Sequence, residues 1–164
     1  MVSIYLFRDR NISQPHGPCC VLRLSAAEIS VSQYELSVIV PAYNEAEHLS
    51  MSIDRFLEIT ESISGNCEII IVDDGSRDST WQSIVASHAR HPEVHGIRLA
   101  RHFGKDAALF AGLAHCRGAA AITIDADLQH PPELMSTFYK LWQESDIRIV
   151  DGVRCGIRGG STVR

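Results

Sequence analysis

The stretch ITIDADLQHPPE, residues 122–133, joins the end of an apolar run, residues 119–124, to the carboxylates Asp125 and Asp127. The apolar run predicts a buried strand. Side chains two residues apart on a strand point to the same side, so both carboxylates can converge on one ligand, and Gln129 can join them if the extended backbone continues. Mg²⁺ and Mn²⁺ bind such oxygen atoms and share their remaining positions with water and phosphates. This stretch therefore predicts a metal and diphosphate site.

Two other readings of the same stretch remain open. Asp125 and Asp127 could belong to an acidic turn that caps a helix, with Pro131 and Pro132 in the first helical turn. They could also form the carboxylate pair of a glycoside hydrolase, because neighbours on one face of a strand lie roughly 6 to 7 Å apart, at the short end of the inverting range. The hydrolase reading is disfavoured, since it gives no role to the other acidic motifs of the chain.

Strand-like and helix-like segments alternate on both sides of this stretch. Apolar runs predict strands over 36–40, 68–72, 94–99, 120–124 and 147–153. Apolar residues at helical spacing predict helices over 49–63, from a cap at Asp78 or Ser79 to Pro92, over 106–116 and over 132–143. Such alternation predicts an α/β fold with a mostly parallel sheet and right-handed crossovers.

Polar residues follow four of the predicted strands. They are PAYNE (41–45), DDGS (73–76), DADLQ (125–129) and Arg154. Ligands of open α/β sheets bind outside the carboxyl ends of the strands, so these four clusters should meet at one edge. The alternative is that each cluster only caps a helix.

The expected edge would gather the acidic side chains of Glu45, Asp73, Asp74, Asp125 and Asp127. These charges repel one another unless cations or hydrogen-bond donors intervene, and a divalent metal would resolve the conflict. The planar guanidinium of Arg154 suits phosphates, and Lys105 is a second candidate. The chain has no GxGxxG after its first strand and no GxxxxGK[ST], which excludes the Rossmann dinucleotide and P-loop classes.

Bulk composition narrows the class of protein further. The chain has 164 residues, a formal net charge of -5 and five cysteines without a CxxC pair. The acidic balance argues against a nucleic-acid partner, and the cysteine spacing supports neither a zinc site nor a disulfide framework. No apolar run reaches the roughly 18 residues of a membrane span, and the N-terminus is a poor signal peptide. We therefore expect a cytoplasmic location for the chain as given.

Five ordered motifs of this chain resemble the family 2 inverting glycosyltransferases, which have the GT-A fold. The motifs are PAYNE at 41–45, VDDGSRDST at 72–80, RHFGKDAALFAGL at 101–113, DADLQHPPEL at 125–134 and DGVR at 151–154. The similarity is greatest to the branch that makes polyprenyl-phosphate sugars, namely the dolichol-phosphate mannose synthases and the bacterial enzymes that use undecaprenyl phosphate. It covers about residues 36–154.

The resemblance implies roles for individual residues. Those that match nucleotide-sugar-binding positions are Pro41, Tyr43, Glu45, Val72, Asp74, Asp125, Ala126, Asp127 and Arg154. Within the DXD motif, Asp127 is expected to bind Mg²⁺ or Mn²⁺ together with Gln129, while Asp125 and Ala126 lie against the nucleoside. Arg154 is expected near the diphosphate or the acceptor phosphate. The implied catalytic residues are Asp125, Asp127 and Arg154.

The implied activity is transfer of a sugar, with inversion, from a UDP- or GDP-sugar to polyprenyl phosphate. The resemblance also implies a longer protein, with acceptor-binding and membrane-associated parts beyond residue 164, so we expect this piece to be poorly active alone. The alternative is a non-catalytic nucleotide-sugar-binding module.

Three regions are expected along the chain. Residues 1–33 read as a poorly ordered N-terminal extension, because prolines, glycine and a cysteine pair break any periodicity, and a start site assigned too early would explain them. Residues 34–154 form the GT-A nucleotide-sugar-binding half. Residues 155–164 are a glycine-rich, truncated tail.

Overall fold

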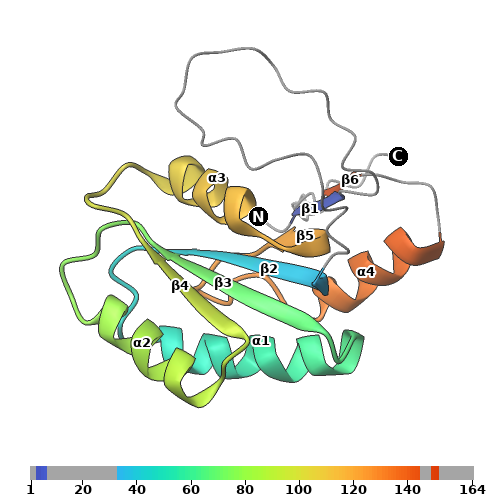
Figure 1. Cartoon of the computed structure of the whole chain (residues 1–164), viewed down its shortest axis with the longest axis horizontal. Coiled ribbons are helices and arrows are strands. Elements are labelled where there is room, and N and C mark those ends of the chain that lie inside the picture. Colours follow the sequence, from blue (N-terminus) through green and yellow to red (C-terminus); the bar gives the residue numbers. More distant parts are fainter. Residues whose placement is uncertain (1–2, 7–32, 145–148, 152–164) are drawn as a thin grey trace, which may run out of the picture.

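The computed structural model describes residues 3–6, 33–144 and 149–151, which form a layered α/β domain with one sheet between helices (Figure 1). The strands are β1 (Ser3–Leu6), β2 (Tyr34–Ala42), β3 (Cys67–Asp73), β4 (Val94–Arg98), β5 (Gly118–Thr123) and β6 (Ile149–Asp151). The helices are α1 (Leu49–Ile63), α2 (Thr80–Arg90), α3 (Lys105–His115) and α4 (Leu134–Glu144). Within the described residues, no helix is long and apolar enough to cross a membrane.

The strand order in the described sheet is β4-β3-β2-β5-β1-β6. β2 pairs in parallel with both β3 and β5, and β3 pairs in parallel with β4. The α/β fold with a mostly parallel sheet is thus confirmed. The chain moves outward from β2 through β3 to β4 and then returns to the other side of β2 as β5. The carboxyl ends of β2 and β5 therefore flank a topological switch point, where ligands bind in open α/β sheets.

One strand was not predicted. β1 lies in the region expected to be an extension, yet it pairs antiparallel with both β5 and β6. Four residues carry too little periodicity to predict a strand, and pairing is decided by the backbone groups that the edge of β5 presents. The expectations for residues 7–32, for the tail at 155–164 and for Arg154 lie outside the described residues.

The apolar runs are buried on both faces of the sheet, as a parallel sheet requires. Along β2, Val38 and Val40 pack on the side of α1, whereas Ile39 packs on the side of α3. α3 lies on the opposite side of the sheet from α1 and α2 (Figure 1). A Cβ added to Gly112 would lie 2.4 Å from Cγ2 of Ile39, so a small residue lets α3 approach the sheet closely.

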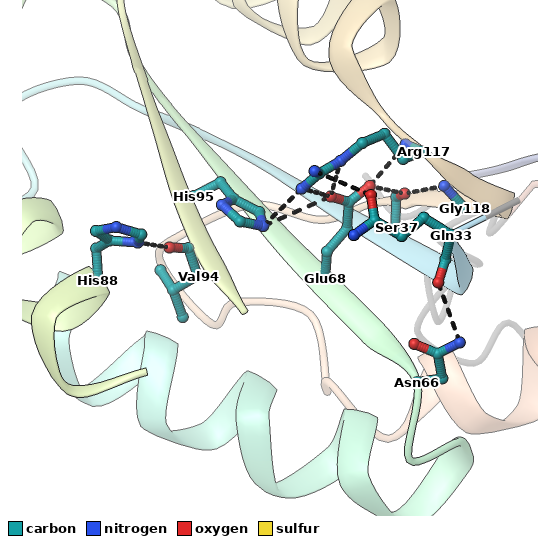
Figure 2. A network of polar contacts seen from close by, with 9 residues as sticks. All are labelled: Gln33, Ser37, Asn66, Glu68, His88, Val94, His95, Arg117 and Gly118. Carbon is teal, nitrogen blue, oxygen red and sulfur yellow. Dashed lines mark hydrogen bonds and ion pairs between the residues drawn. The ribbon is translucent and has the colours of Figure 1, made fainter. Parts of the chain in front are cut away.

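A buried carboxylate ties the amino ends of three strands together (Figure 2). Glu68 is fully buried, and its Oε1 accepts hydrogen bonds from the Ser37 hydroxyl at 2.7 Å and from the backbone N–H of Arg117 at 2.6 Å. Its Oε2 accepts from the Arg117 guanidinium at 2.8 and 3.0 Å. The Ser37 hydroxyl in turn accepts the N–H of Gly118 at 2.8 Å. The network joins β2, β3 and the start of β5 at the end of the sheet remote from the switch point.

His95 borders this network, and its surroundings favour the neutral form of the ring. Burial lowers the pKa of His95, and the Arg117 cation lowers it further. The neutral ring can therefore accept the hydrogen bond that the Arg117 guanidinium donates to Nε2 at 2.8 Å.

The substitution Arg117→Ala should destabilise the domain by about 3 kcal/mol, because it leaves the buried Glu68 charge without its cation. The double variant with Glu68→Gln should regain part of this loss, since the uncompensated charge is then gone. Urea unfolding followed by tryptophan fluorescence measures both. Arg90→Ala, which removes an exposed arginine, is the control and should cost less than about 0.5 kcal/mol. Equal costs for Arg117→Ala and the control would contradict a structural role for the network.

Candidate functional site

A cavity of about 320 Å³ opens at the carboxyl ends of the strands, at the switch point between β2 and β5. Its lining residues come from the ends of β2, β3 and β5, from the β4–α3 loop and from the first turn of α3. They are Pro41, Ala42, Tyr43, Glu45, Asp74, His102, Lys105, Ala108, Asp125, Ala126 and Asp127. A larger cavity of about 710 Å³ lies around the end of α1 and the start of β3, and none of the predicted site residues line it. The smaller cavity is therefore the candidate site.

Of the ten residues to which the family resemblance assigns a role, seven meet in this cavity: Pro41, Tyr43, Glu45, Asp74, Asp125, Ala126 and Asp127. Lys105, the second phosphate candidate, lines it as well. Three others do not line it. Val72 is fully buried between the sheet and α3, Gln129 is exposed beyond the end of β5, and Arg154 lies outside the described residues.

Asp74 holds the loop that precedes α3. This carboxylate is 2% exposed, and it accepts the backbone N–H groups of Phe103 at 2.8 Å and Gly104 at 2.9 Å. It also lies 2.8 Å from Nδ1 of His102. The end of β3 thereby fixes the position of residues 102–104.

A close backbone approach reinforces this attachment. Gly75 has a φ of +70°, and a Cβ at this position would lie 2.4 Å from the carbonyl carbon of Arg101. Only glycine combines this left-handed conformation with such a short distance to another backbone. The glycine of the DDGS motif therefore serves the contact with the β4–α3 loop.

The PAYNE and DDGS motifs also brace each other. The N–H of Asn44 donates to the Ser76 hydroxyl at 2.9 Å, and the N–H of Glu45 donates to Oγ1 of Thr80 at 2.9 Å. The side chain of Asn44 accepts the N–H of Arg77 at 2.9 Å. These bonds place Tyr43 at the cavity, where its ring stacks on His102 with the centroids 4.1 Å apart and the planes inclined by 26°.

The two carboxylates of the DADLQ motif have different surroundings. Asp125 is partly buried and forms an ion pair with Lys105, the first residue of α3. Burial on its own would raise the pKa of Asp125, but its charged partners, Lys105 among them, outweigh burial and lower it. Asp127 is exposed, and its Oδ1 accepts the N–H of Gln129 at 3.0 Å.

Glu45 lies close enough to Asp127 for the two charges to interact. Burial raises the pKa of Glu45, and the negative charge of Asp127 raises it further. Among the described residues, neither Glu45 nor Asp127 forms an ion pair with a lysine or arginine, so this part of the cavity is more acidic than the Lys105–Asp125 pair.

The acidic residue Asp73 does not belong to the cavity. It is fully buried, its Oδ1 accepts the N–H of Ser76 at 2.9 Å, and its Oδ2 lies 3.3 Å from Nε of Arg98. The hydrogen bond closes the DDGS turn, so the role of Asp73 is structural.

Sequence reasoning assigned no role to His102. Its signal was available, because RHFGK follows the end of β4 as the other motifs follow β2, β3 and β5. β4 is short and half-exposed, so its sequence predicts a strand end less clearly than those of β2, β3 and β5.

The strand order and the cavity at the switch point are those of an α/β domain of the GT-A type. The chain belongs to glycosyl transferase family 2, which matches residues 37–164. This membership decides against the glycoside hydrolase reading of Asp125 and Asp127.

Two curated relatives are similar to this chain. It is 40% identical over 110 residues to an uncharacterised glycosyltransferase of Synechocystis sp., a match that covers 67% of this chain and 35% of the relative. It is 41% identical over 100 residues to the undecaprenyl-phosphate 4-deoxy-4-formamido-L-arabinose transferase of Shewanella sediminis, a match that covers 60% of this chain and 30% of the relative. The matched region thus spans about a third of the length of each.

Solved structures show the same fold. The mannosyltransferase PcManGT of Pyrobaculum calidifontis, in complex with GDP-Man and Mn²⁺, superposes with a TM-score of 0.56 at 25% identity over 66% of this chain and 32% of that protein. TarS 1–349 of S. aureus, in complex with UDP-GlcNAc, gives a TM-score of 0.50 at 26% identity over 57% of this chain and 26% of that protein.

Replacing Gly75 with alanine should destabilise the domain by about 3 kcal/mol, because the new Cβ adds a clash with the backbone of Arg101 to the strain of a positive φ. Gly104→Ala is the matched control. Gly104 also has a positive φ, +104°, but a Cβ there meets nothing within 4 Å, so it should cost only about 1 to 2 kcal/mol. Urea denaturation compares the two variants. Equal losses would show that the contact between Gly75 and the loop has no energetic weight.

The variant Asp127→Asn should move the pKa of Glu45 back toward its ordinary value, because the second-largest of the causes that raise it disappears. Burial remains the larger cause, so the reversal should be partial. The measurement is the pH titration of the Glu45 carboxyl carbon by NMR. Asp106→Asn removes an exposed acid that does not line the cavity and should leave this titration unchanged. A Glu45 titration that ignores Asp127→Asn would mean that the two carboxylates are not coupled.

Proposed function

We propose that this chain contains the donor-binding half of an inverting glycosyltransferase that moves a sugar from a UDP- or GDP-sugar to polyprenyl phosphate. The observation that carries the proposal is the meeting of seven predicted residues in one cavity at the switch point of the sheet. The lining of the cavity suits a nucleotide ligand. The stacked rings of Tyr43 and His102 lie at one part of it, and Lys105 and the carboxylates lie at another.

The relatives support the donor and acceptor classes. PcManGT was solved with GDP-Man and TarS with UDP-GlcNAc, so both bases occur among structures with this fold. The Shewanella relative is named for transfer to undecaprenyl phosphate. In the proposed complex, Pro41, Tyr43, Glu45 and Asp74 surround the nucleoside together with Asp125 and Ala126. The family resemblance also assigns Val72 to this set, but its side chain is buried under α3 and does not line the cavity. The roles of Gln129 as a metal ligand and of Arg154 at a phosphate belong to the same proposal.

The donor atoms of the cavity fit a divalent cation such as Mg²⁺ or Mn²⁺. In the described residues no group of three or more His, Cys, Asp or Glu side chains could enclose a metal. The exposed Asp127, coupled to Glu45, instead offers hard oxygen ligands in a region of excess negative charge. Mg²⁺ is held in this way, by one or two carboxylates with water and substrate phosphates. The proposed ligands are Asp127 and Gln129, and PcManGT contains Mn²⁺.

The proposed reaction is a direct displacement at the anomeric carbon. An oxygen of the acceptor phosphate forms the new bond on one face, while the bond to the nucleoside diphosphate breaks on the other and its electron pair leaves with the diphosphate. The second pKa of a phosphate monoester is about 6, so the acceptor is already ionised at neutral pH and no strong base is required. A bound metal would act as a Lewis acid toward the leaving diphosphate. Lys105 can exchange its pairing with Asp125 for a contact with phosphate.

Titration with UDP and GDP, with and without Mn²⁺, tests the donor half of the proposal. We expect binding that strengthens at least tenfold with Mn²⁺, and we expect Asp127→Ala to abolish this gain because it removes a metal ligand. Isothermal titration calorimetry is the measurement. Glu61→Ala, which removes an exposed carboxylate of α1 outside the cavity, is the control and should behave as the wild type.

Metal-independent binding that survives Asp127→Ala would favour the non-catalytic binding module instead. The absence of UDP and GDP binding under all conditions would contradict both readings. Transfer of radiolabelled sugar to polyprenyl phosphate by the full-length protein then separates an enzyme from a module.

A further inference from the structure

We propose that His102 is a base-binding residue: its imidazole and the ring of Tyr43 form one stacked wall against which the nucleobase of the donor lies. This inference rests on the proposed function and adds a residue from the β4–α3 loop to the donor site. Three observations support it: the imidazole of His102 stacks on Tyr43 at the cavity, Asp74 fixes its orientation, and Lys105 follows three residues later.

The imidazole of His102 lies at the surface of the cavity. His102 and Tyr43 both line the cavity, and their rings are nearly parallel, with centroids 4.1 Å apart. The His102 side chain is 53% exposed, and Tyr43 is 36% exposed. A stacked pair that served only the core would be buried. Here the pair leaves aromatic surface open to the cavity, and planar bases stack on such surfaces.

The ring is also held in place before any ligand binds. Nδ1 of His102 lies 2.8 Å from Oδ2 of Asp74, a carboxylate that is itself fixed by the N–H groups of Phe103 and Gly104. The proton on Nδ1 is assigned from this acceptor. Because one carboxylate orients both the loop and the ring that the loop carries, little rotamer freedom remains to be lost on binding.

Along the chain, an aromatic residue, His102, is followed by a cation, Lys105, just as the base of a nucleoside diphosphate is followed by its phosphates. Three residues further on, Lys105 begins α3 and lies in the same cavity beside Asp125. One short segment thus supplies a planar surface at one point and a cation at another. A base stacked on His102 would leave its phosphates to extend toward Lys105 and the carboxylates.

NMR titration of the chain with UDP, GDP and pyrophosphate, each in the presence of Mg²⁺, tests this role. Pyrophosphate shares the phosphates but has no base. We expect His102→Ala to weaken UDP and GDP binding about tenfold, as for the loss of one stacking partner, and to change pyrophosphate binding less than twofold. His102→Phe, which keeps a ring but not the bond to Asp74, should regain most of the affinity.

His115→Ala is the matched control, since it removes an exposed histidine at the far end of α3 and should leave every affinity unchanged. A direct readout is an intermolecular NOE between the base protons of bound UDP and the imidazole protons of His102, which we expect in the wild type. The inference is overturned if His102→Ala binds UDP and GDP as tightly as the wild type, or if it weakens pyrophosphate by the same factor. If the wild type binds neither nucleotide, the proposed function itself fails.

Discussion

The carboxylate of Asp74 is the contact on which the candidate site depends. It is almost wholly buried at the end of β3, and it accepts two backbone N–H groups of the β4–α3 loop while pairing with His102. A buried carboxylate needs such donors, because an unpaired charge away from water is costly. The requirement that Asp74 be satisfied therefore draws the loop to β3. The loop then places His102 beside Tyr43 and positions the start of α3, with Lys105, at the cavity.

The charged side chains of the cavity have two kinds of surroundings. Asp125 is paired with Lys105, whereas Asp127 faces Glu45 and the two carboxylates repel each other. A pair of opposite charges suits a region that can exchange one partner for a phosphate, and excess negative charge suits a cation. Two carboxylates that look alike in the sequence thus acquire different properties from their neighbours, and the neighbours come from distant elements.

Most of the fold could be predicted from the sequence, because the apolar runs of strands such as β2 and β3 are long enough to be buried on both faces of the sheet. Because the carboxyl ends of parallel strands meet at one edge of the sheet, the positions of the motifs after the strands predict that Tyr43, Asp74 and Asp127 lie together, and all three line the cavity. The same rule applied to β4 would have included His102. The sequence signal for β4 is weak, because its residues alternate between less and more exposed positions and His95 and Gly96 interrupt its apolar run.

The sequence by itself determined the α/β alternation and the edge of the sheet at which the polar motifs meet, since these follow from short-range periodicity and from the position of polar residues after strands. The resemblance of five ordered motifs, and not periodicity, indicated the family. Only the tertiary structure decided which of those residues share a cavity and which of their charges are paired. It buried Val72 under α3, set Asp73 to close a turn, paired Asp125 with Lys105 and inserted β1 beside β5. Such outcomes depend on contacts between residues far apart in the chain, and local patterns do not encode those contacts.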